Sequence, residues 1–212
     1  MKTMKKWIGV VGLTLMVCVL FGIKTANATP DPVAMLKSIA DQLIAELKAN
    51  KTSLPENPSL VYSLANKIVV PHANIPEMSK RVLPPSVWGK ATEAQRSEFE
   101  SEFTTLLVRT YASALAQYKD QTIRFLPLRG GYEGKTSIQV QSIIDRTDGP
   151  SISVNYRLLL GGSEWQLYDL IVEGVSLIDS FRSQFADQLS QGGTMDSVIK
   201  NLKQHNADNS GN

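Results

Sequence analysis

The stretch that decides the fold is KTSIQVQSIIDRTDGPSISVNYRLLL, residues 135–160. Apolar residues alternate with polar ones over 135–145 and again over 151–160, the period of a β-strand that is buried on one face. Asp148-Gly149-Pro150 lies between the two runs and is a short turn signal, so we expect the strands to be antiparallel neighbours. The stretch therefore predicts a β-hairpin with one apolar and one polar face.

Two more strands flank this hairpin, over residues 122–126 and 164–172. Gly130-Gly131 and Gly161-Gly162 supply the short turns that antiparallel neighbours require. The sequence therefore predicts a four-stranded antiparallel meander.

Helical periodicity replaces the strand period on both sides of the meander. Asp31-Pro32 predicts a capped first helix, and Thr92 with Gln95 has the spacing of a capping box at the start of a long helix. The other helices are expected over residues 59–70, 175–191 and from Thr194, with irregular or short-helical structure over 71–90. We therefore predict an α+β fold in which helices from both chain halves pack on the apolar face of the sheet.

The first 28 residues have the three-part organisation of a secretory signal peptide. Lys2, Lys5 and Lys6 precede an apolar run over residues 7–23, and Ala26-Asn27-Ala28 places small residues where a signal peptidase cuts. We therefore expect cleavage after Ala28, export into the cell envelope and no membrane anchor.

Removing that segment changes the charge balance. Four lysines and no acidic residue are lost from 22 basic and 20 acidic residues, which leaves a net charge of −2. Nucleic acid is therefore not an expected partner, because phosphate binding needs a clustered positive surface. The remaining chain lacks cysteine, so its stability rests on its core. We expect one domain over residues 29–204 and a disordered polar tail over 205–212.

The sequence offers little for catalysis or for holding a metal ion. Its two histidines, His72 and His205, are not spaced as metal ligands, and no nucleophile or phosphate-binding motif is present. Asp145 and Asp169 are separate carboxylates of the kind that cap turns. We therefore predict that the protein is not an enzyme and has no cofactor or metal.

The segment WQLYDLIVEGVSL, residues 165–177, resembles the signature of the MlaC family of periplasmic phospholipid-binding proteins. Other residues agree with the family in the right order: Val82-Leu83, Trp88, Ala91-Thr92, Gln95-Arg96, Phe99, Phe103, Leu106-Leu107, Thr110-Tyr111, Leu115, Tyr118, Phe181, Phe185 and Gly192-Gly193. The resemblance covers about residues 31–204. Ala73-Asn74 and Pro84-Pro85 depart from the family pattern.

The resemblance implies a soluble periplasmic carrier that moves phospholipid between the two membranes and so maintains outer-membrane lipid asymmetry. It implies two partners, an outer-membrane lipoprotein–porin complex and an inner-membrane ABC transporter with an MCE-domain subunit. It also implies an apolar cavity between the sheet and the long helix, where the lipid would lie.

Candidate lipid-binding residues are the apolar positions on those two surfaces, which an ordinary packed core would explain equally well. They are Phe103, Leu107, Tyr111 and Leu115 on the long helix and Val140, Ile144, Val154, Tyr156 and Leu158 on the strands.

Four residues of the signature segment, Tyr168, Asp169, Gly174 and Ser176, have an expected structural role. Gly174 permits the turn from strand to helix, and Ser176 caps that helix. Arg182 lies on the exposed side of the helix, where it could contact a lipid head group or a partner.

Two other functions remain open. An enzyme with a cone-shaped apolar cavity would place an acid such as Asp169 beside its substrate with a raised pKa. A protein-binding adaptor or chaperone would use an exposed apolar groove instead.

Overall fold

The computed structural model describes residues 29–54, 57–116 and 120–208. The expected signal peptide, residues 1–28, lies outside the described residues. The described helices are α1 (Pro32–Ala49), α2 (Pro58–Ile68), a 3-10 turn η1 (Val70–His72), α3 (Ile75–Val82), α4 (Pro85–Lys90), α5 (Glu93–Ala116), α6 (Leu177–Ser190) and α7 (Met195–Asp208). None of the helices in these ranges combines the length and apolar character that a membrane span requires.

Side-chain caps fix where several helices begin. The Asp31 carboxylate accepts hydrogen bonds from the backbone N–H of Val33 at 2.8 Å and of Ala34 at 3.2 Å. The capping box at α5 is confirmed, because Gln95 N–H donates to Thr92 Oγ1 at 3.2 Å and Thr92 N–H donates to Gln95 Oε1 at 2.9 Å. These bonds satisfy amide groups that a helix leaves without partners at its first turn.

The sheet contains five strands, all paired antiparallel in chain order: β1 (Thr122–Phe125), β2 (Ser137–Asp145), β3 (Ile152–Gly161), β4 (Glu164–Val172) and β5 (Val175–Ser176). The expected count of four strands was therefore wrong by one. Glu173 (φ 50°) and Gly174 (φ 83°) make a tight turn that pairs Val175 with Val172. Two residues are too few to show a period of two, which is why the sequence pattern missed β5.

The β2–β3 hairpin has the predicted faces. Ile138, Val140 and Ser142 are buried, while Ser137, Gln139 and Gln141, which alternate with them, are exposed. The register pairs Val140 with Tyr156 and Ser142 with Val154, so these side chains share one face of the sheet.

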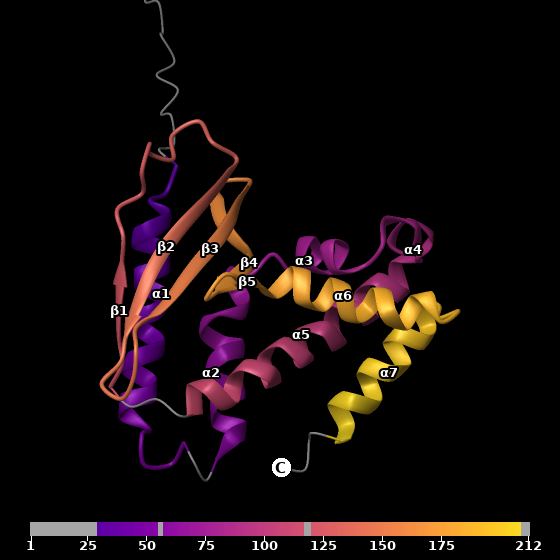
Figure 1. Ribbon diagram of the computed structural model, residues 1–212, viewed down its shortest axis with the longest axis horizontal. Coiled ribbons are helices and arrows are strands. Elements are labelled where there is room, and N and C mark those ends of the chain that lie inside the picture. The colour runs from indigo at the N-terminus through magenta and orange to yellow at the C-terminus, as the bar shows by residue number, and fades with distance from the viewer. Residues whose placement is uncertain (1–28, 55–56, 117–119, 209–212) are drawn as a thin grey trace, which may run out of the picture.

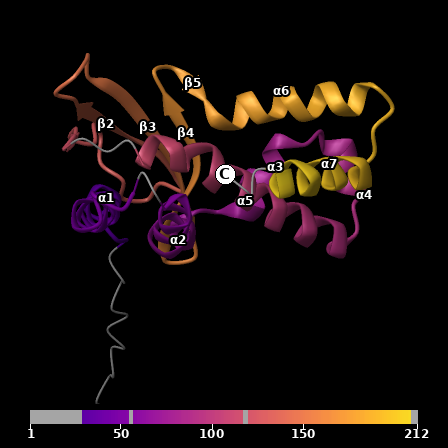
Figure 2. The same ribbon diagram turned by 90° about the horizontal axis from the view of Figure 1, so that it is seen from below.

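The helices fall into two groups around the sheet (Figure 1). α1 runs along the sheet, and Leu36 packs there against Ile138, Val140, Leu158 and Trp165. α3, α4, α6 and α7 gather beyond the β4–β5 edge, with α5 extending from that group toward α2 (Figures 1 and 2). Helices from both chain halves therefore pack against the sheet, α1 along it and α3 and α6 against β4, as the α+β prediction required.

The buried apolar residues form three separate clusters. The helical cluster contains Met78, Val82, Leu83, Ala91, Phe99, Phe103, Leu106, Leu107, Leu177, Ile178, Phe181, Phe185, Met195, Val198, Ile199 and Leu202. The α1–α2 cluster contains Leu47, Leu54, Val61, Leu64 and Ile68, and the sheet cluster contains Leu36, Ile138, Val140, Leu158 and Trp165.

α5 packs mainly against other helices, namely α2, α3 and α7. We expected its aromatic stripe to face the sheet. The Phe103 ring instead lies 5.6 Å from Phe99, 5.3 Å from Phe181 and 5.9 Å from Phe185, measured between ring centroids. Aromatic rings pack favourably at these separations, so the N-terminal half of the stripe is satisfied inside the helical cluster.

Residues 205–208 are helical, although we expected a disordered tail to begin at His205. α7 continues through Asp208, and residues 209–212 lie outside the described residues. Asn206 is buried, and its amide donates to the Glu102 backbone oxygen at 3.0 Å and to Glu102 Oε2 at 2.8 Å. These bonds offset the desolvation of the amide and hold the last turn of α7 against α5.

Candidate functional site

The apolar face of the sheet carries the five strand residues expected to contact lipid. Val140 and Leu158 are fully buried and belong to the sheet cluster, while Ile144 and Tyr156 are half-buried. Val154 has only 5% of its surface exposed, yet among the described residues it belongs to none of the three clusters. The structure therefore brings these residues to one face of the sheet.

One polar pair interrupts this apolar face. Ser142 Oγ and Tyr156 Oη lie 3.1 Å apart and form a hydrogen bond. Burial raises the pKa of Tyr156 because it disfavours the charged phenolate, although the hydrogen bond with Ser142 offsets part of this effect. The pair keeps both hydroxyl groups satisfied, so the face remains compatible with an apolar ligand.

The four helix residues on the candidate surface occupy different environments. Phe103 has no exposed surface, and Leu107 is also buried in the helical cluster. Leu115 packs against the α1–α2 cluster, whereas Tyr111 is 41% exposed. The sequence therefore predicted one continuous stripe, but the structure divides it between the helical cluster, the surface and the α1–α2 cluster.

Tyr111 is the most exposed of the four helix residues. Partial burial raises the pKa of its phenol, and the negative charge of Asp169 raises it further. Tyr111, Val172 and Val175 are the large apolar side chains that remain exposed in the described part of the chain. Val172 pairs with both Val154 and Val175, so an exposed apolar edge continues directly from the buried face.

Sequence reasoning missed Val172 and Val175. Val172 lies two residues after Leu170 on the same face, a continuation of the strand period that could have identified it. Val175 depends on β5, which has no pattern of its own. A register irregularity beside Arg157 and Leu158 also leaves Tyr168 as an extra residue in β4, so the alternation along that strand changes phase.

Asp169 has a structural arrangement. It is fully buried and accepts hydrogen bonds from Ser176 Oγ at 2.8 Å, from the Ile178 backbone N–H at 3.0 Å and from Arg157 Nη1 at 3.0 Å. Ser176 in turn caps α6 by accepting from Asp179 N–H at 3.1 Å. The carboxylate therefore joins β3, β4 and the start of α6. This is a structural role, as we expected for Asp169 and Ser176.

Asp145, the other carboxylate named from the sequence, has separate contacts. Asp145 accepts from Ser151 Oγ at 2.8 Å, lies 3.4 Å from Arg124 Nη2 and has a side chain that is 40% exposed. The structure therefore does not bring Asp145 and Asp169 together as a pair of acids. Within residues 29–54, 57–116 and 120–208, no group of three or more His, Cys, Asp or Glu side chains is placed to hold a metal ion.

The two segments that depart from the family pattern have separate positions. Ala73 forms a parallel bridge with Leu167, and Asn74 N–H donates to the Leu167 backbone oxygen at 2.7 Å. Asn74 also caps α3 by accepting from Glu77 N–H at 3.0 Å, so this segment fastens α3 to β4. Pro84 and Pro85 lie at the start of α4, near Arg182 of α6, where they line a surface pocket.

Comparison with known proteins gives one consistent result. The sequence profile of the family described as "MlaC protein" matches residues 37–204. The "Toluene tolerance protein ttg2D" of Pseudomonas putida is 29% identical over 166 residues, which cover 78% of this chain and 76% of that protein. The "Intermembrane phospholipid transport system binding protein MlaC" of Haemophilus influenzae is 26% identical over 205 residues, covering 95% of this chain and 93% of that protein.

A solved structure is also similar. The phospholipid-binding protein of Ralstonia solanacearum, determined in complex with a phospholipid, superimposes with a TM-score of 0.77 at 28% sequence identity. The match covers 84% of this chain and 98% of that one.

Proposed function

Because the chain belongs to the MlaC family, we propose that it is a non-catalytic phospholipid carrier of the periplasm, which holds a lipid between the apolar face of the sheet and the C-terminal half of α5. The observation that carries this proposal is the likeness to the phospholipid-binding protein of Ralstonia solanacearum, which was determined in complex with a phospholipid. A lipid would complete the core between the sheet and α5.

The energy of lipid transfer explains why a carrier needs such a surface. Two acyl chains expose roughly 30 methylene groups, and each costs about 0.8 kcal/mol in water, so roughly 24 kcal/mol opposes passage of the bare lipid. Binding by a protein offsets this cost only if the chains contact apolar side chains. The head group is stable in water and can remain at the mouth of the site.

The residues that we propose to contact the acyl chains are Val140, Ile144, Val154, Tyr156 and Leu158 on the sheet and Leu107, Tyr111 and Leu115 on α5. Phe103 would support the site from behind, because its ring is enclosed by three other phenylalanines. The exposed apolar edge of Tyr111, Val172 and Val175 would form the mouth, since exposed apolar side chains beside a buried apolar face can guide a chain inward.

We further propose the two partners of such a carrier, an outer-membrane lipoprotein–porin complex and an inner-membrane ABC transporter with an MCE-domain subunit. The relative from Haemophilus influenzae supports this proposal, because its name assigns it to an intermembrane phospholipid transport system. Exchange with complexes in both membranes would maintain outer-membrane lipid asymmetry.

Lipid uptake from vesicles tests the proposal. Delipidated protein is mixed with vesicles of radiolabelled phosphatidylethanolamine and phosphatidylglycerol, and the vesicles are then sedimented. We expect labelled lipid to remain in the supernatant with the protein. Protein that takes up no lipid would refute the carrier function.

Two adjacent isoleucines provide a matched pair for this assay. Ile144 and Ile143 are both half-buried on β2, but Ile144 pairs with Ile152 on the apolar face, whereas Ile143 pairs with Ser153 on the opposite face. We expect Ile144→Glu to lower uptake, because a carboxylate would contact the acyl chains, and Ile143→Glu to leave uptake near the wild-type level. Equal losses in the two variants would contradict the proposed location of the lipid.

A further inference from the structure

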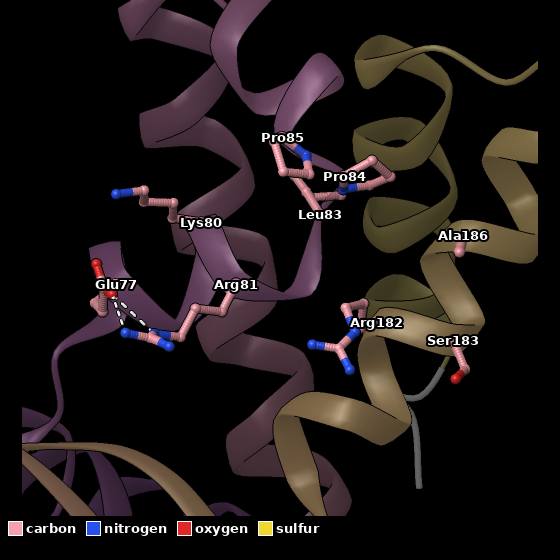
Figure 3. Close-up of a pocket in the computed structure, with 9 residues that line it drawn as sticks. All are labelled: Glu77, Lys80, Arg81, Leu83, Pro84, Pro85, Arg182, Ser183 and Ala186. Atoms are coloured by element: carbon pink, nitrogen blue, oxygen red, sulfur yellow. Dashed lines mark hydrogen bonds and ion pairs between the residues drawn. The ribbon is translucent and has the colours of Figure 1, made fainter.

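A surface pocket of about 630 Å³ lies between α3, the link from α3 to α4, and α6. Pro84, Pro85 and Ala186 contribute its apolar lining, and Arg182 extends from α6 toward α3 (Figure 3). Pro84 and Pro85 have fixed backbone φ angles, so this side of the pocket changes little in shape when a ligand binds. The pocket is therefore a preformed apolar surface with a cation beside it.

The charges around the pocket are mainly positive. Arg81 is already engaged, since its Nη2 lies 2.6 Å from Glu77 Oε1 and its guanidinium lies 4.5 Å from the centroid of the Tyr168 ring. Arg182 pairs with Asp179 at 2.6 Å, but both side chains are more than half exposed, so this contact is easily exchanged for another carboxylate. Lys80 also lines the pocket and forms no ion pair with any described residue.

We propose that this pocket docks a segment of a partner protein in which acidic and aliphatic side chains lie next to each other. The aliphatic side chain lies on Pro84, Pro85 and Ala186, and the acidic side chains pair with Arg182 and Lys80. The inference rests on the proposed function, because a carrier must recognise the membrane complexes with which it exchanges lipid. Complementary charge at the rim supplies orientation and association rate, and the apolar lining supplies contact area.

The charge arrangement favours a peptide over a membrane surface. Glu77 and Asp179 lie among the cations, and both would approach an anionic bilayer together with Lys80, Arg81 and Arg182. The chain without residues 1–28 also carries a net charge of −2, which disfavours broad attraction to acidic lipids. A peptide can direct single carboxylates at the cations and keep them away from the two acids.

Site-specific photo-crosslinking in the native cells tests this inference. Benzoylphenylalanine replaces Ser183, which is exposed and lines the pocket, or Ser137, which is exposed on β2 as a control position. After irradiation, mass spectrometry identifies the crosslinked segment. We expect position 183 to yield a protein adduct whose crosslinked segment contains Asp or Glu beside aliphatic residues, and position 137 to yield none.

Charge reversal then tests the role of the cations. We expect Lys80→Glu combined with Arg182→Glu to reduce the position-183 adduct by about tenfold or more, because like charges would face the acidic segment. Lys67→Glu combined with Lys200→Glu makes the same change in charge at exposed positions of α2 and α7 and should leave the adduct unchanged. The neutral pair Lys80→Gln and Arg182→Gln provides a milder second variant.

Several results would overturn the inference. They are the absence of a protein adduct at position 183, an adduct with lipid alone, a crosslinked segment without acidic residues, or an adduct that survives charge reversal. The phospholipid content of each purified protein separates this inference from the proposed function. We expect the charge-reversed protein to retain the wild-type lipid content. A wild-type protein that neither contains nor takes up lipid would contradict the carrier function. The docking proposal would then be tested by the crosslinking result alone.

Discussion

Replacement of Asp169 by alanine should destabilise the protein far more than replacement of an exposed carboxylate. The substitution removes the acceptor for two buried donors, Ser176 Oγ and the Ile178 backbone N–H. Each buried donor left without a partner costs about 1–3 kcal/mol, so we expect a loss of about 2–6 kcal/mol in the free energy of unfolding. Arg157 adds little to this loss, because its side chain is 39% exposed and water can solvate it.

Urea unfolding monitored by tryptophan fluorescence measures this loss. Asp145→Ala provides the matched control, because Asp145 also accepts a serine hydroxyl and lies near an arginine, but at an exposed position. We expect the control to lose less than about 1 kcal/mol. If the two alanine variants lost equal amounts of stability, Asp169 would not hold β4 and α6 together as described.

Three further outcomes follow from the same structure. Val140→Phe should cost about 1–3 kcal/mol in the free energy of unfolding by overpacking the sheet cluster, where Val140 has no exposed surface, whereas Val175→Phe should cost little, because Val175 is 63% exposed; equal stability losses in urea unfolding would contradict the burial of Val140. The unfolding free energy should fall as pH rises above 10.0, the ordinary pKa of tyrosine, because burial raises the pKa of Tyr156 in the folded state and the unfolded phenol ionises first. Tyr156→Phe should show a smaller fall over that range, and an unchanged pH profile would argue against the burial of this phenol.

Local patterns were sufficient to predict most of the secondary structure. Alternation over β2 and β3 identified the hairpin and its apolar face, since a strand buried on one side has a period of two. Asp31, Thr92 and Ser176 predicted helix starts, because each satisfies backbone N–H groups within its own turn. These signals involve only a few neighbouring residues.

The partner of each apolar face could not be predicted in the same way. Periodicity shows that Phe103 and Leu107 lie on an apolar stripe of α5, but it does not show whether a sheet or another helix covers that stripe. The register irregularity at Arg157 and Leu158 and the bridge from Ala73 to Leu167 likewise depend on contacts between distant segments. The nine candidate lipid contacts remain predictions for the same reason, because local periodicity does not show whether protein or lipid covers an apolar face.

Native mass spectrometry of the protein purified without added lipid tests the central claim most directly. The claim is that phospholipid chains, and not the protein's own side chains, complete the core between the sheet and α5. We expect the intact protein to carry the additional mass of a phospholipid, which collisional activation releases and fragmentation identifies. A protein that has only the mass of its polypeptide, and that still has only that mass after incubation with phospholipid vesicles, would contradict the account.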